Sequence, residues 1–582
     1  MPTESVRRRA LCGWSLFAAL LLGGLGACAE SEAGSDGLSN EGATGATGSY
    51  EELLRLFEEW REFERPELVD GAPDYAAAEA AWAEGLGDFR SRLAALDPSG
   101  WSVPEQVDYH LVRAEMNGLD FNLRVLRPWA RDPAFYASVR TYQSDTPAEE
   151  GPTIHHPLRL WEYSIWPRTS LSEPEPLSPE EAERMADELR AIPVLLDRAR
   201  ENLAGSDARD LWMGGIRAFE NQSAALERLA GLVEETDVGV GEAALQARSA
   251  TDAFADWLEA EAGSRTGSSG VGTELYTWFL RHVLLLPISW EEEVTIMERE
   301  LARSHASLRL EEHRNRNLPE LEPAANPEDF ARMQEGSIQK YMRFMEENEI
   351  VPIRDWMGRA LRERTFSYSP PETRNFFGQA THREPMTLWT HYYHWWDLAV
   401  MEEEPHASPI RQAPVLYNIW MSRSEGLATG MEEWMMHAGL YDDNPRAREI
   451  VWIMLATRAA RGLGSLQAHS NELTMEEAGD LHVEWTPRGW MRRDLDLLGF
   501  EQHLYLRQPG YGPSYVTGAR LLEDLMAERA RQLGDDFSLE RFFGEVDGAG
   551  MIPVSLLRWE LTGRDDEILG LMADDTPLET LL

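Results

Sequence analysis

Apolar residues recur at intervals of three and four along most of the chain. Near its start, Leu53, Leu54, Phe57 and Trp60 have the spacing that is typical of an amphipathic helix. Comparable patterns predict further helices over 74–96, 105–127, 179–204, 208–235, 243–262, 273–285, 290–314, 327–348, 350–364, 388–403, 411–438, 444–469, 474–482, 513–533, 538–546 and 553–561. No alternating run is long enough to demand a sheet, although a minor strand or two could form near 365–380. We therefore expect a mainly α fold.

The first residues of the chain have the pattern of an export signal. Residues 7–9 are arginines, and the apolar run over 11–25 is too short to cross a membrane. The sequence LGAC, which ends at Cys28, resembles the bacterial lipobox, in which the cysteine is lipidated and becomes the first mature residue. We therefore expect residues 1–27 to be removed. The lipid on Cys28 would then anchor the chain to a membrane, at the periplasmic face of the outer membrane or at the cell surface.

Composition limits the other possible partners. The 582 residues carry a formal net charge of −46, and a polyanion of this kind is repelled by nucleic acid. Removal of the signal would leave Cys28 as the last cysteine, which excludes disulfides and cysteine metal sites. Residues 28–48 are rich in Gly, Ser, Ala and acidic residues and predict a flexible tether. Residues 49–582 would then form a single α-helical domain, over which the proline- and aromatic-rich segment 129–176 forms a long loop.

Two histidines and a glutamate form a candidate metal site. His391 and His394 lie three residues apart, so on a helix they share nearly the same face. Glu425, on the next predicted helix, is the natural third ligand, and Asp397 could add a fourth or orient an imidazole. A zinc site needs about three protein ligands with an open position for water. A single ion would require a ring nitrogen of both histidines to come within about 4–5 Å of a Glu425 oxygen.

Several segments carry a family resemblance. SEGLATGMEEWMMHAGLYDD, residues 424–443, resembles the EGWALYAEELMxEAGFYDD signature of the bacterial domain-of-unknown-function family numbered 885. Residues 272–294, 458–478 and 505–525 are similar to further segments of that family, and the resemblance covers roughly 50–570. Members are α-helical, often exported proteins with a presumed zinc-peptidase site. The resemblance therefore implies one large multi-helical body with a gluzincin-like arrangement of helices around a central cleft.

The metal motif of that family is altered in this chain. The motif is HExxPGHH, and the segment in register with it is THYYHWWDL, residues 390–398. His391 takes the place of the first histidine, but Tyr392 replaces the glutamate that serves as base. A tryptophan pair replaces Pro-Gly, and Asp-Leu replaces the paired histidines. Since the unperturbed pKa of a tyrosine is about 10, Tyr392 cannot serve as a base at neutral pH.

Other residues could supply the missing chemistry. A base would have to come from Glu432, Glu384 or the acidic run 402–404. Tyr511 and Tyr515 follow a Pro-Gly turn and could donate hydrogen bonds to a developing oxyanion.

The sequence leaves two functions open. One is a metal-dependent hydrolase, a peptidase, in which His391, His394 and Glu425 hold zinc and Tyr515 and Glu432 assist. The other is a non-catalytic descendant without a required cofactor, in which the two histidines could be hydrogen-bonded core residues. Its aromatic cleft would bind a peptide or another ligand through Trp389, Tyr392, Tyr393, Trp395, Trp396, Asp397 and Tyr511. The missing glutamate favours the second function.

Overall fold

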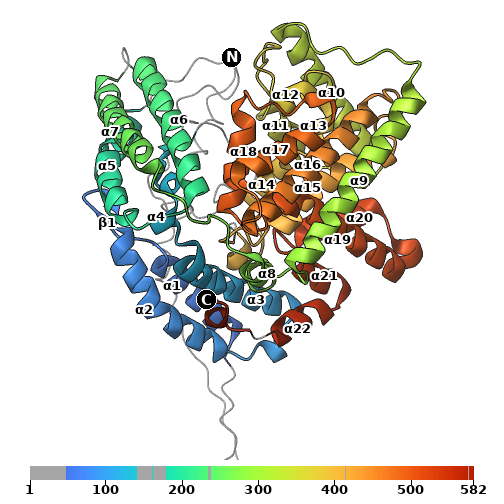
Figure 1. Ribbon diagram of the computed structural model, residues 1–582. Helices are drawn as coiled ribbons and strands as arrows, with labels where there is room; N and C mark the ends of the chain where they lie inside the picture. Colours follow the sequence, from blue (N-terminus) through green and yellow to red (C-terminus); the bar gives the residue numbers. More distant parts are fainter. Residues whose placement is uncertain (1–47, 141–159, 162–177, 234–236, 413–414, 575) are drawn as a thin grey trace, which may run out of the picture. The chain divides into compact units, whose positions relative to one another are not determined.

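The computed structural model describes residues 48–140, 160–161, 178–233, 237–412, 415–574 and 576–582. Thr47–Leu582 forms one compact unit, and the regular secondary structure of its described part is almost entirely helical (Figure 1). The prediction of a mainly α fold is therefore confirmed. The predicted signal, Cys28 and nearly all of the tether lie outside the described residues.

The first half of the unit contains ten α-helices among its described residues. They are α1 (Tyr50–Phe63), α2 (Tyr75–Ala94), α3 (Val103–Phe121), α4 (Pro128–Arg131), α5 (Pro179–Asn202), α6 (Arg209–Val233), α7 (Val238–Ala262), α8 (Thr273–His282), α9 (Trp290–Asn315) and α10 (Pro327–Glu347). Several begin directly after a capping residue. For example, Ser289 and Glu292 form a reciprocal capping box at the start of α9.

The second half of the unit carries the segments that resemble the family. Its helices are α11 (Met357–Arg362), α12 (Phe376–Thr381), α13 (Met386–Trp389), α14 (Tyr393–Glu403), α15 (Met421–His437), α16 (Ala447–His469), α17 (Met475–Trp485), α18 (Asp496–Arg507), α19 (Tyr511–Leu533), α20 (Leu539–Gly548), α21 (Val554–Thr562) and α22 (Asp566–Ala573). The hydrophobic pattern missed α12, α18 and α22. An interior glycine, Gly499, weakens the helical pattern of α18.

The strands are short and lie away from the predicted position. β1 (Leu68–Val69) pairs antiparallel with β2 (Ala72–Pro73), and β3 (Val139–Arg140) pairs parallel with β4 (Leu160–Trp161). The expectation of a strand near 365–380 is wrong, because that segment is irregular until α12 begins.

Two predicted helices are interrupted. The segment 388–403 is not one helix, because α13 ends at Trp389 and α14 begins at Tyr393, which leaves His391 in the turn between them. The helix predicted over 411–438 begins only at α15, since Tyr417 and Asn418 have positive φ angles of 61° and 56°, which an α-helix does not allow. The helix predicted over 350–364 is likewise reduced to α11.

Four helices form the centre around the candidate site. α15 packs against α19 and α16, α16 packs against α9 and α19, and α9 also packs against α19 (Figure 1). Nearly every residue of α15 and α16 is buried. Charged residues of these two helices are therefore held inside the protein, among them Arg423, Glu425, Glu432, Arg458 and Arg461.

Two glycines bring α15 and α19 into backbone contact. A Cβ atom on Gly518 would lie 2.8 Å from the Cα of Gly426 and 2.9 Å from the carbonyl carbon of Ser422. Because both positions lack a side chain, the helices approach closely enough for the start of α19 to reach Glu425 on α15.

Candidate metal centre

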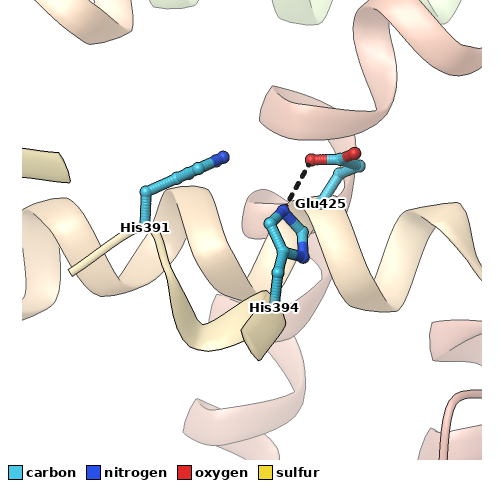
Figure 2. A group of neighbouring side chains, drawn as sticks. All are labelled: His391, His394 and Glu425. Carbon is cyan, nitrogen blue, oxygen red and sulfur yellow. Dashed lines mark hydrogen bonds and ion pairs between the residues drawn. The ribbon is translucent and has the colours of Figure 1, made fainter. Parts of the chain in front are cut away.

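His391, His394 and Glu425 converge in the protein interior (Figure 2). One ligand atom of each residue lies within 4.8 Å of the other two. The three side chains are buried, with 4%, 1% and 0% of their surface exposed. Figure 2 shows both imidazoles reaching toward the carboxylate. The geometric condition for a single ion is therefore met, and this group could hold a metal.

The carboxylate of Glu425 has two close partners. Nε2 of His394 lies 3.1 Å from its Oε2, and the hydroxyl of Tyr511 donates a 2.6 Å hydrogen bond to its Oε1. Burial alone would raise the pKa of Glu425, but His394, Tyr511 and Arg461 lower it below its ordinary value. Glu425 is therefore ionised at neutral pH, as a metal ligand must be. The other ring nitrogen of His394, Nδ1, lies 3.0 Å from Oγ of Ser424.

His391 lies beside a buried ion pair. Its Nδ1 is 3.2 Å from Oε1 of Glu432 and 3.2 Å from Nη2 of Arg458. Burial, with the nearby Arg458, His394 and Arg461, lowers the pKa of His391 well below its ordinary value. The imidazole is therefore neutral, the form in which a histidine binds a metal.

Glu432 is held by Arg458. The guanidinium of Arg458 donates to both carboxylate oxygens, at 2.6 and 2.7 Å. Burial raises the pKa of Glu432 to about 7, although Arg458 opposes this effect. The sequence suggested Glu432 as a base. Its place against Nδ1 of His391 also suits the carboxylate that orients a metal-binding imidazole.

The ring of Tyr515 lies beside the ring of His391. The two rings are nearly parallel, with centroids 6.1 Å apart. The guanidinium of Arg461 lies 4.1 Å from the Tyr515 ring and pairs with Glu501 of α18 at 2.7 Å. The sequence analysis missed Arg461 and Glu501. Arg461 lies in the segment 458–478 that resembles the family, and this resemblance could have indicated it.

The aromatic residues that were expected to line a cleft are mostly buried in the helical packing. The Trp396 ring stacks on Tyr341 with centroids 5.4 Å apart, and its Nε1 donates to the Met357 carbonyl. The Tyr393 hydroxyl donates to Asp547 at 2.8 Å. Trp389 and Trp395 are buried as well, while Tyr392 is half-buried. A ligand-binding role for these residues stays a prediction.

The remaining candidates lie outside the metal group. Asp397 forms an ion pair of 2.5 Å with Arg423, and burial raises its pKa although Arg423 opposes this effect. Glu384 accepts a 2.6 Å hydrogen bond from Asn444. In the acidic run 402–404, the last two residues pair with arginines of the segment 354–359.

The fold and the site define a class: a mainly α-helical protein with a buried His/His/Glu group that could hold a metal. The chain belongs to the family described as "Bacterial protein of unknown function (DUF885)", whose model matches residues 66–365 and 362–561. No curated protein matches the chain.

Two solved structures share the fold. One is a "putative lipoprotein of unknown function" from Shewanella oneidensis, with a TM-score of 0.60 and 14% identity over 88% of this chain and 100% of that chain. The other is a "putative lipoprotein" from Colwellia psychrerythraea, with a TM-score of 0.59 and 13% identity over 84% of this chain and 91% of that chain. Within the described residues, no helix has both the length and the apolar character needed to cross a membrane.

Proposed function

We propose that this chain is an exported, lipid-anchored protein that binds a divalent metal ion, Zn²⁺ by its ligand set, through His391, His394 and Glu425. With this site it binds a peptide or another ligand, without the ordinary catalysis of a zinc peptidase. The observation that carries the proposal is the convergence of the three ligand atoms within 4.8 Å of one another. Two nitrogens and one carboxylate oxygen are typical zinc ligands and leave one coordination position for a bound group.

The surroundings of the three ligands support metal binding. Each ligand has an outer partner: Ser424 for His394, Glu432 for His391, and Tyr511 for Glu425. Such partners fix the orientation of an imidazole or a carboxylate and raise its affinity for a metal. When bound, the metal would supply a Lewis acid that attracts a carbonyl or carboxylate oxygen of the ligand.

We propose that ordinary peptidase catalysis is absent because the site lacks a suitable general base. Tyr392 stands where the family motif has its glutamate. The acid beside His391, Glu432, accepts hydrogen bonds from both terminal nitrogens of Arg458. A carboxylate held in this way is suited to orienting His391 rather than to taking a proton from water.

One observation favours a second candidate, a metal-dependent hydrolase. Burial raises the pKa of Glu432 to about 7, and a general base is most effective when its pKa is near the operating pH. Hydrolysis of a peptide library by the zinc-loaded protein, lost in Glu432→Gln while zinc is still bound, would establish this candidate over the first.

Metal content tests the proposal directly. The mature chain, residues 28–582 with Cys28→Ser, is purified without a histidine tag, and zinc is measured by mass spectrometry and by calorimetry. We expect stoichiometric zinc in this protein, strong loss in His391→Ala and Glu425→Gln, and no loss in the control His313→Ala, which is exposed on α9. If the unsubstituted site holds no zinc and added zinc gives no thermal shift, the metal proposal is refuted.

The lipid anchor is tested separately. It is supported by the LGAC sequence ending at Cys28 and by the description of both structural neighbours as lipoproteins. We expect the wild-type chain in the membrane fraction, with lipid on Cys28 by mass spectrometry, and Cys28→Ala in the soluble fraction. Equal membrane association of the two proteins would contradict the anchor.

A further inference from the structure

Another buried carboxyl group contacts α19, the helix that carries Tyr511. Glu293 of α9 is fully buried and contacts two hydroxyl groups. The hydroxyl oxygen of Tyr276, on α8, lies 3.0 Å from Oε2 of Glu293, and the hydroxyl oxygen of Thr517, on α19, lies 3.1 Å from Oε1 of Glu293. No guanidinium or ammonium group is among its contacts in the described part of the chain. A buried carboxylate without a cation is unfavourable, so this group is stable in its neutral form.

The titratable neighbours of Glu293 do not share its behaviour. Burial raises the pKa of Glu293 to about 8. Burial and Glu293 together raise the pKa of Tyr276 well above its ordinary value. His469 of α16, whose ring lies 5.2 Å from that of Tyr276, has its pKa lowered by burial to about 4. Between pH 5 and 9 Glu293 therefore changes its charge, while Tyr276 and His469 stay neutral.

These contacts lead to the start of α19. The Tyr276 hydroxyl accepts a 3.1 Å hydrogen bond from the backbone N–H of Gly510. Gly510 has a φ angle of 84°, and a Cβ atom there would lie 2.6 Å from Cδ1 of Leu284, so the turn requires glycine. The next residue, Tyr511, donates the 2.6 Å hydrogen bond to Glu425. Glu293 thus holds the residue before α19, Gly510, through Tyr276, and holds α19 itself directly through Thr517.

We propose that Glu293 and Tyr276 are positioning residues, which fix the first turns of α19 so that Tyr511 meets Glu425. When Glu293 loses its proton, the buried charge must attract water or shift its hydroxyl partners, and the Tyr511–Glu425 contact loosens. The readout by metal affinity rests on the proposed function. The readouts by stability and hydrogen exchange do not.

The test compares the mature protein with Glu293→Gln, because glutamine has the shape and hydrogen-bonding capacity of the neutral carboxyl. Since the pKa of Glu293 is higher in the folded protein, the stability it contributes is present below the unfolded pKa of about 4.5 and is lost as the pH rises to about 8. The melting temperature of the variant, relative to wild type, should therefore increase between pH 5 and 8 and then level off. If the melting temperatures of the two proteins differ by the same amount at every pH, Glu293 does not titrate in this way.

Two further readouts address positioning. In zinc titrations, the affinity of wild type relative to the variant should be constant below pH 7 and should fall about fivefold by pH 9, when about nine-tenths of a group with pKa 8 is ionised and the ionised form binds about tenfold more weakly. In the metal-free protein, hydrogen-exchange protection of residues 508–515, corrected for intrinsic rates, should fall above pH 8 in wild type but not in the variant.

The outcomes separate the two proposals. If neither protein binds zinc, the proposed function fails, and the exchange experiment still decides the positioning role. If protection near Gly510 is the same in both proteins at every pH, the positioning role is overturned, whatever the zinc result. Should Glu293→Gln fail to fold, Tyr276→Phe replaces it, and it must lower protection at Gly510 at all pH values for the proposal to stand.

Discussion

Replacing Gly518 by alanine should damage the candidate site without touching its ligands. A Cβ atom at this position would overlap the Ser422 carbonyl oxygen, and it would lie 2.8 Å from the Cα of Gly426 and 2.9 Å from the Ser422 carbonyl carbon. Carbon atoms in contact prefer a separation of about 3.5–4.0 Å, so α15 and α19 must move apart by at least about 1 Å. Such a shift would lengthen the 2.6 Å Tyr511–Glu425 hydrogen bond beyond about 3.5 Å, where it ceases to be one.

The expected size of the effect follows from these distances. Overpacking of this kind costs about 1–3 kcal/mol, and loss of an outer partner of a metal ligand lowers metal affinity by about 10- to 100-fold. The matched control is Gly336→Ala, because Gly336 lies in α10 with open space around its Cα. There alanine should stabilise the helix by up to about 1 kcal/mol. Urea unfolding and zinc calorimetry measure both effects. If Gly518→Ala matches the control in both assays, the close helix contact is not what positions Tyr511.

Three further substitutions test other parts of the structure. Tyr511→Phe should lower zinc affinity by about tenfold in calorimetry and the free energy of unfolding by only about 1 kcal/mol. Arg411→Met leaves the buried Asp108, its partner at 2.6 Å, without its cation and should cost about 3–5 kcal/mol in urea unfolding. Burial alone would raise the pKa of Glu433, but hydrogen bonds, chiefly from Arg303, lower it to about 2. Its carboxylate therefore stabilises the fold above pH 4.5, and this stability is lost as the pH falls toward 2. Glu433→Gln should lower the free energy of unfolding by at most about 3 kcal/mol at pH 7 and should have no effect near pH 2. Solvent screening of Arg303 makes the loss at pH 7 smaller than this bound.

The helical class could be predicted from the sequence because most helices have one apolar and one polar face. For α9, the hydrophobic pattern predicts a helix over 290–314, against 290–315 in the structure. The interruptions could not be predicted, because they depend on distant contacts. Tyr417 takes a positive φ angle and donates a hydrogen bond to Glu64, which lies in a remote part of the chain. Local sequence propensities cannot predict such a contact.

The three metal-binding residues of the candidate site could be predicted from the sequence, but the residues that surround them could not. Residue type and order indicate His391, His394 and Glu425, because these side chains bind zinc and the family resemblance places two of them. Their partners come from packing: Ser424 is an ordinary helix residue in the sequence, and Arg461 has no visible link to Tyr515. The expectation that His391 and His394 share one helix face is wrong, since His391 lies in the turn before α14. They converge through that turn instead.

The charged interior of α15 and α16 is hard to explain by stability alone. Arg423, Glu425, Glu432, Arg458 and Arg461 are all buried, and well-packed apolar residues in place of buried ion pairs often leave a protein equally stable or more stable. The charges are also organised, because the Glu432–Arg458 pair lies beside His391, while Arg461 lowers the pKa of Glu425. Groups whose pKa values are shifted by burial and by specific partners concentrate at functional sites. The partners of the three metal-binding side chains fix the orientation of these side chains, and none of them is well placed to act as a base. This arrangement fits a site that binds a molecule rather than one that hydrolyses it.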